Sequence, residues 1–265
     1  MQTVRLCFFL LMELLTKLMK MKSLKHAKPL LQFPSFIQQK SYTSIPLLCP
    51  TQELQTTTTT LKLTNQELTK INLLIPRLCL SDNLTTATHL TTTALLTNPP
   101  HSSISLSILV HSLTSQPDMT QPMSLLTTLR HSPQAHNHLT PITTMLVMSY
   151  VRKKRVKEAF KVYQWMTRPG SPCKVEKIVF LGLVDGFCEL GLVVDGLRVL
   201  RDMVGVGFVP GDGLRRRVFR KMLMEARVKE GLELDKALCF CANGGVDGIV
   251  KVRDLLDNII GNWTE

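Results

Sequence analysis

The chain has 265 residues, of which 44% are hydrophobic, and its formal net charge is +12. This length suits one or two domains with a real hydrophobic core. The seven cysteines are scattered without a Cys-x-x-Cys pair, which argues against a zinc site and favours free, buried thiols. No segment after residue 44 reaches the length of a transmembrane helix.

The first 44 residues carry seven Lys or Arg and a single acidic residue, Glu13. A basic, amphipathic and acid-poor composition is typical of an organellar transit peptide. Two alternatives remain: residues 6–18 are a signal-peptide core or membrane anchor, or the true start is Met19 or Met21. The first is disfavoured because Glu13 and Lys17 interrupt a run too short to span a bilayer. We expect a transit peptide over residues 1–44, for the mitochondrion or, alternatively, the chloroplast.

Residues 45–68 have the composition of a linker. They include two prolines and five consecutive threonines at 56–60. Such a run cannot form the packed face of a helix, so we expect an extended or disordered segment.

From residue 69 onward an apolar pattern repeats every 35 to 37 residues. A leucine marks each unit: Leu74, Leu109, Leu146 and Leu183. A small or alanine-like position follows about thirteen residues later: Ala87, Pro122, Ala159 and Gly196. Seven residues beyond it comes another apolar residue: Ala94, Leu129, Met166 and Met203. This period predicts stacked helical hairpins.

The expected repeats span residues 69–103, 104–140, 141–177 and 178–211. The third contains helices at about 142–152 and 156–166, and the fourth at about 179–190 and 193–203. In the second repeat, Pro117 falls between the helices, whereas Pro122 falls early in the second helix and is tolerated there only in the first turn.

Residues 212–265 are expected to cap the array. Residues 212–238 read as a long helix or a hairpin, and residues 246–260 as a last amphipathic helix. An array of repeats needs such a cap, because its terminal apolar face would otherwise be open to solvent.

Signals for catalysis are missing from the sequence. The histidines form no ligand motif, and His131, His136 and His138 are predicted to lie in a Pro-flanked loop between repeats. No Gly-rich loop with a phosphate-binding lysine occurs. We therefore expect no enzymatic activity, no cofactor and no metal.

The fourth repeat resembles a pentatricopeptide repeat. It has the order D-G-x-C-x-x-G at residues 185–191, L-x-x-L-x-x-M at 197–203 and G-x-x-P at 207–210. Residues 155–166 of the third repeat support the resemblance, which covers residues 69–211. The tetratricopeptide repeat shares the length, but its Trp, Leu-Gly and Tyr signature is absent. The resemblance implies an all-α, right-handed α-solenoid of about four hairpins.

This family resemblance further implies binding of single-stranded RNA, one base per repeat. The bases would be read by two residues in each repeat: Asn72 with Ser103, Ser107 with Thr140, Thr144 with Lys177, and Leu181 with Gly211. Asn72 with Ser103 is a pairing that favours cytosine, whereas Leu181 and Gly211 have no hydrogen-bonding side chain. The base-reading candidates are Asn72, Ser103, Ser107 and Thr144.

Two clusters of basic residues are candidates for phosphate contacts, which give affinity without reading sequence. They are Arg152, Lys153, Lys154 and Arg155, and then Arg215, Arg216, Arg217, Arg220 and Lys221. We expect a protein that binds organellar RNA and acts in its processing, stability or translation, beside ribosomal or other RNA-processing proteins. The alternatives are a scaffold subunit associated with the mitochondrial ribosome or another RNA-protein complex, and a peptide binder of the tetratricopeptide kind.

Overall fold

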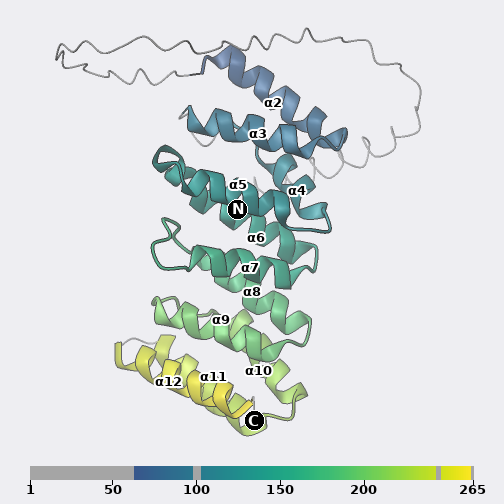
Figure 1. Cartoon of the computed structure of the whole chain (residues 1–265). Coiled ribbons are helices and arrows are strands. Elements are labelled where there is room, and N and C mark those ends of the chain that lie inside the picture. The colour runs from purple at the N-terminus through teal and green to yellow at the C-terminus, as the bar shows by residue number, and fades with distance from the viewer. Residues whose placement is uncertain (1–62, 98–102, 243–245, 264–265) are drawn as a thin grey trace, which may run out of the picture. The chain divides into compact units, whose positions relative to one another are not determined.

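The structure of the protein, a computed structural model, describes residues 63–97, 103–242 and 246–263 (Figure 1). Over these ranges it contains eleven α-helices, a short 3-10 helix and no strand. All the helices belong to one compact unit, Thr57–Glu265. The predicted transit peptide and most of the predicted linker lie outside the described residues. The prediction of an all-α protein is confirmed for the described part of the chain.

The helices pack as sequential pairs, and the first helices of successive pairs also pack against one another (Figure 1). The pairs are α2 (Asn65–Leu80) with α3 (Leu84–Leu96), α4 (Ser107–Ser115) with α5 (Thr120–Arg130), α6 (His136–Arg152) with α7 (Val156–Met166), α8 (Lys177–Glu189) with α9 (Val193–Gly205), and α10 (Asp212–Met224) with α11 (Val228–Ala242). The last helix is α12 (Val246–Trp263).

The repeating positions of the sequence form the core between the pairs. All of them are buried except Leu74, whose side chain is 45% exposed. Leu74 lies on α2, and the described part of the chain has no earlier helix to cover it. Pro122 lies in the first turn of α5, where its missing N–H removes no helical hydrogen bond. The helix therefore continues through the proline.

Four of the five pairs share one turn between their helices. In each, the second residue after the first helix has a positive φ: Asp82, Lys154, Gly191 and Ala226. The next amide then donates to the carbonyl five residues back: Asn83 to Leu78, Arg155 to Tyr150, Leu192 to Phe187, and Arg227 to Met222. This bond belongs to the Schellman motif, which ends a helix and reverses the chain. In the second pair Pro117 keeps Gln116 extended, so the motif is absent there.

The structure corrects two predicted boundaries near the N-terminal half. Helix α2 begins at Asn65 rather than at residue 69, because Thr64 and Glu67 form a capping box across its first turn. Helix α6 begins at His136, so His136 and His138 lie in a helix and not in a loop. The buried Leu139 extends the apolar side of α6 before Pro141, and its burial favours the longer helix.

The C-terminal region consists of a hairpin followed by a single helix. The predicted segment 212–238 forms the two helices α10 and α11, separated at Ala226. Helix α12 packs against α11 and also against α9. Its contacts include an ion pair between Arg201 and Asp257 at 2.9 Å, and Arg227 lies over the Trp263 ring at 5.2 Å from its centroid.

Polar side chains also join each pair to the next. The buried hydroxyls of Thr114 and Ser149 are 2.7 Å apart and connect α4 to α6. Arg217 pairs with Asp185 at 2.6 Å and connects α10 to α8. The buried Thr114–Ser149 contact fixes the register between its two pairs, because a shift of one turn would leave these hydroxyls without partners.

The shared turn gives a stability prediction. Ala226 is exposed and has a φ of +60°, where a Cβ is strained by about 1–2 kcal/mol. We expect Ala226→Gly to raise the free energy of unfolding by about 1 kcal/mol in urea titrations. The matched control is Gly191→Ala, because Gly191 has a φ of +75° and a Cβ there would meet no atom within 4 Å. It should lower the free energy by a similar amount; shifts of the same sign in both variants would contradict the strain argument.

Candidate nucleic-acid interface

The base-reading candidates lie on or just before the first helices of successive pairs. Asn72 is on α2, Ser107 is the first residue of α4, and Thr144 is on α6. Because these helices pack against one another in order, the three side chains belong to one layer of the structure. Leu181 follows on α8 and lines a hollow of about 470 Å³ between α6, α8 and α10.

Asn72 holds the backbone that leads into the second pair. Its side-chain N–H donates to the carbonyl of Ser103 at 2.7 Å, and its Oδ1 accepts from the amide of Ser105 at 2.8 Å. The structure thus brings the Asn72 side chain into contact with the backbone of Ser103. Each end of the Asn72 amide already has a hydrogen bond within the protein, so this side chain has a structural role whether or not it meets a base.

The other base-reading candidates differ in whether their hydroxyl groups already have hydrogen-bond partners within the protein. Thr144 donates its hydroxyl to Glu176 at 3.0 Å, and the Thr140 hydroxyl accepts from the Lys174 amide at 3.1 Å. The Ser107 hydroxyl is exposed and has no hydrogen-bond partner among the described residues. Ser107 is therefore the candidate best able to meet a ligand without first breaking a bond.

Two members of the first basic cluster cap the preceding pair. The Lys153 ammonium donates to the His111 carbonyl at 2.6 Å and to the Ser115 hydroxyl at 2.6 Å. The Arg155 guanidinium donates to the carbonyls of Thr114 and Pro117, both at 2.9 Å. Cations stabilise the last carbonyls of a helix, so both residues hold the end of α4 and its turn.

Members of the second basic cluster face different neighbours. Arg215 pairs with Asp235 of α11 at 2.9 Å, and Arg217 pairs with Asp185 of α8. Arg216 and Arg220 are exposed and have no partner among the described residues, and Lys221 is half-buried. Of this cluster, Arg216, Arg220 and Lys221 are the cations available to a phosphate.

The fold brings the two basic clusters to the same carboxylate. Glu189, at the end of α8, pairs with Lys154, whose hydrogen bond and charge lower the pKa of Glu189. Arg217 and Lys221 lower it further. Cations that are more than sixty residues apart in sequence are thus close in space, at the edge where the first helices turn into the second.

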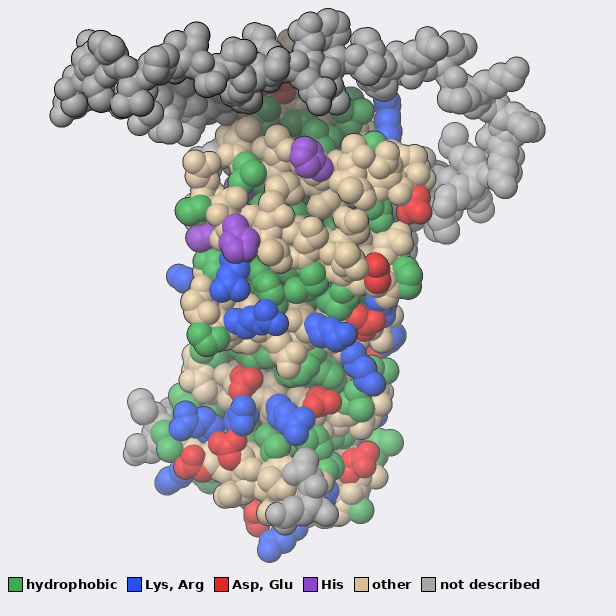
Figure 2. All heavy atoms as spheres, viewed as in Figure 1, with side chains coloured by type: hydrophobic (Ala, Val, Ile, Leu, Met, Phe, Trp, Pro, Cys, Tyr) green, Lys and Arg blue, Asp and Glu red, His purple; other side chains and the backbone are tan. Residues whose placement is uncertain are grey.

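Charge is unevenly distributed over the surface. Figure 2 shows most of the Lys and Arg side chains over the region of α7 to α12, whereas the region of α3 and α5 is largely uncharged. The sequence agrees, because residues 141–265 carry 21 Lys or Arg and 15 Asp or Glu, against four of each in residues 45–140. A phosphate backbone would therefore be attracted mainly to the C-terminal half.

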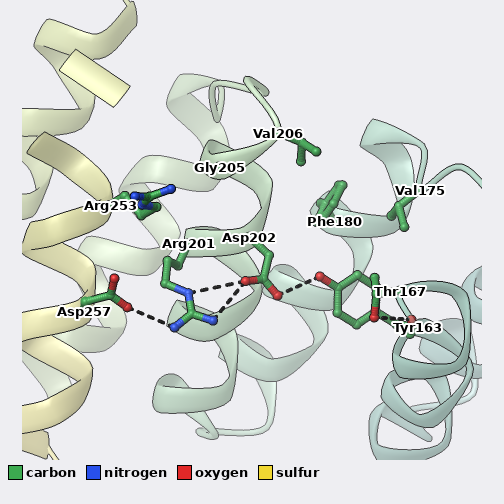
Figure 3. A pocket seen from close by; sticks show the side chains of 10 residues that line it. All are labelled: Tyr163, Thr167, Val175, Phe180, Arg201, Asp202, Gly205, Val206, Arg253 and Asp257. Carbon is green, nitrogen blue, oxygen red and sulfur yellow. Dashed lines mark hydrogen bonds and ion pairs between the residues drawn. The ribbon is translucent and has the colours of Figure 1, made fainter. Parts of the chain in front are cut away.

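A second hollow, of about 630 Å³, lies between α7, α8, α9 and α12 and was not predicted from the sequence (Figure 3). A chain of polar contacts crosses it: the Tyr163 hydroxyl donates to Asp202 at 2.8 Å, and Arg201 pairs with Asp202 at 3.1 Å and with Asp257 at 2.9 Å. Burial, together with the Asp202 carboxylate, raises the pKa of Tyr163 well above its usual value. The only signal in the sequence was that Tyr163 and Asp202 are polar residues inside otherwise apolar helical stripes.

Comparisons with known proteins identify no family. A scan against models of protein families finds no match to this chain. A search of curated proteins finds no similar sequence. Within the described residues, no helix is both long and apolar enough to cross a membrane, and no group of three or more His, Cys, Asp or Glu could hold a metal ion. The described part of the chain is all-helical and consists of stacked helix pairs.

The burial of Lys153 gives a pH prediction. Burial, followed by the charges of Arg155 and Arg152, lowers the pKa of Lys153 from 10.5 to about 8. Between these values the unfolded chain binds more protons at this site than the folded chain, so Lys153 makes stability rise with pH from about 8 to about 10.5. Arg152→Gln should move the Lys153 midpoint upward in a titration of its Cε chemical shift. A wild-type midpoint at the ordinary value would contradict the partly buried position of the ammonium.

Proposed function

We propose that the protein binds single-stranded RNA in an organelle, as a short right-handed α-solenoid of the pentatricopeptide type, and acts in RNA processing, stability or translation. The main support for this proposal is that one type of turn and equivalent buried positions recur in successive helix pairs. It supports a repeat array in which each pair offers one equivalent surface to a linear ligand. Residues 1–44 would be the transit peptide.

The first-helix layer favours this ligand for a chemical reason. Ser107 and Thr144 carry short polar side chains at corresponding points of α4 and α6, and such hydroxyls suit the edges of unstacked bases. Arg216, Arg220 and Lys221 lie further along the same layer, on α10. An RNA strand that followed this layer from α2 to α10 would meet the base-reading candidates first and the phosphate-binding candidates later.

The number of available cations limits the affinity. Five of the nine candidates already pair with carbonyls or carboxylates: Lys153, Lys154, Arg155, Arg215 and Arg217. Each phosphate neutralised on a single strand changes the slope of log K against log salt by about 0.7. Few available cations therefore mean modest affinity, which suits a protein that works beside other RNA-binding proteins.

A salt series tests phosphate binding. The triple variant Arg216→Gln, Arg220→Gln and Lys221→Gln should bind a random single-stranded RNA pool more weakly than wild type, with a slope of log K against log salt shallower by about 2. The measurement is fluorescence anisotropy on the full chain. The matched control is Lys157→Gln, Lys161→Gln and Arg168→Gln, which removes the same charge from exposed positions on and just after α7. Equal losses in both triple variants would indicate a general charge effect and no defined interface.

Base reading is tested at Ser107. Because its hydroxyl has no partner in the described structure, Ser107→Ala should leave the thermal midpoint unchanged and relax one position of the motif that wild type enriches from the pool. Asn72→Ala should both relax a position and destabilise the fold, because it removes two hydrogen bonds to the backbone. If wild type enriches no motif, sequence reading by this layer is ruled out.

The pairing of five candidate cations also favours a second candidate function, that of a scaffold subunit associated with the mitochondrial ribosome or another RNA-protein complex. In that case these charged residues would stabilise the fold, and the protein would contact partner proteins instead of RNA. Salt-resistant co-sedimentation with ribosomal particles, without motif enrichment by the isolated protein, would support the scaffold over the RNA reader.

A further inference from the structure

The pocket between α7, α8, α9 and α12 has one polar wall whose groups are already satisfied. Both oxygens of Asp202 accept hydrogen bonds, one from Tyr163 and the other from Arg201. The remaining NH1 group of Arg201 donates to Asp257 at 2.9 Å. Because each partner is held by another, this wall is fixed before any ligand arrives (Figure 3).

Arg253 is the exception among the charged groups of the pocket. It lies on α12, one turn before Asp257, and has no partner among the described residues. Its stem passes over Gly205, where a Cβ would lie 4.0 Å from the Arg253 Cδ. The guanidinium of Arg253 therefore borders the pocket with its donors available, and it can form a bidentate pair with a carboxylate.

The other wall of the pocket is apolar. It is formed by Val175, Phe180 and Val206 (Figure 3). Val206 is 63% exposed, whereas Phe180 is 2% exposed and is fixed by ring contacts with Tyr163 at 5.8 Å and Phe208 at 6.0 Å. A ligand that covered Val206 would gain apolar burial against a wall that is already rigid.

The charges of the pocket select the class of ligand. Two arginines and two aspartates line it, so its formal charge is zero, and Asp202 and Asp257 would repel a polyanion such as an RNA backbone. A single carboxylate at Arg253 is compatible with this balance. We propose that the pocket binds a segment of a partner protein that presents one carboxylate beside an apolar side chain.

This site is independent of the proposed RNA interface. The charged groups of the pocket come from α9 and α12, whereas the base-reading candidates belong to α2, α4 and α6. Occupation of the pocket by a peptide would leave Ser107 and Thr144 accessible. The protein could then hold an RNA and a protein partner at the same time.

The test uses the full chain and a display library of random short peptides as the probe. We expect enrichment of an Asp, a Glu or a free C-terminal carboxylate next to a large apolar residue. The best synthetic peptide should bind Arg253→Glu about tenfold more weakly or worse, because a charge-assisted hydrogen bond is replaced by repulsion. Lys157→Glu, the same charge change at an exposed position on α7, should bind it as wild type does.

Two further measurements separate a carboxylate contact from a general effect. The peptide with its acid replaced by the amide should bind wild type more weakly, and should bind wild type and Arg253→Gln equally. Val206→Ser should weaken binding of the original peptide because it removes the exposed apolar surface, and it should leave the fold intact because Val206 is 63% exposed. The proposal is overturned if the library enriches nothing, or if Arg253→Glu binds the enriched peptide as tightly as wild type. RNA binding should be the same in Arg253→Glu and wild type, so this result does not depend on the proposed function.

Discussion

The structure depends on burial between neighbouring helix pairs. Leu146 and Leu183 have no exposed surface, because each lies where one pair packs against another. A single pair could not bury such residues on both sides, so stability is shared between neighbours. Helix α9 illustrates this: it contains Gly196 in its interior, which weakens an isolated helix by about 1 kcal/mol, and it is held by α8 and α12.

Basic residues in this protein serve two purposes that the sequence does not separate. The run Arg152 to Arg155 looks like one patch, yet Lys153 and Arg155 hold the end of α4, whereas Lys154 pairs with Glu189. A cation bound to a helix carbonyl is less available to a phosphate, because it must exchange one acceptor for another. Any RNA interface therefore has to be built mainly from the cations that the fold does not use.

Local signals allowed more of the fold to be predicted than of the site. Helix α7 was predicted to the residue, because the turn at Lys154 and the break after Met166 are encoded locally. The start of α6 was missed because the third repeat was expected to begin at residue 141, whereas the buried Leu139 belongs to the same helix. The pocket could not be predicted from the sequence, because it depends on the contact of α12 with α9. That contact joins Arg201 to Asp257, which lie 56 residues apart in the chain.

The return of α12 to α9 also bears on assembly. A stack of helix pairs has an apolar face at each end, and identical stacks can join end to end into fibres because such contacts never close on themselves. Helix α12 covers the flank of α9 that the second helix of a further pair would need. The chain itself therefore covers this flank of α9, so a second copy of the protein cannot pack there.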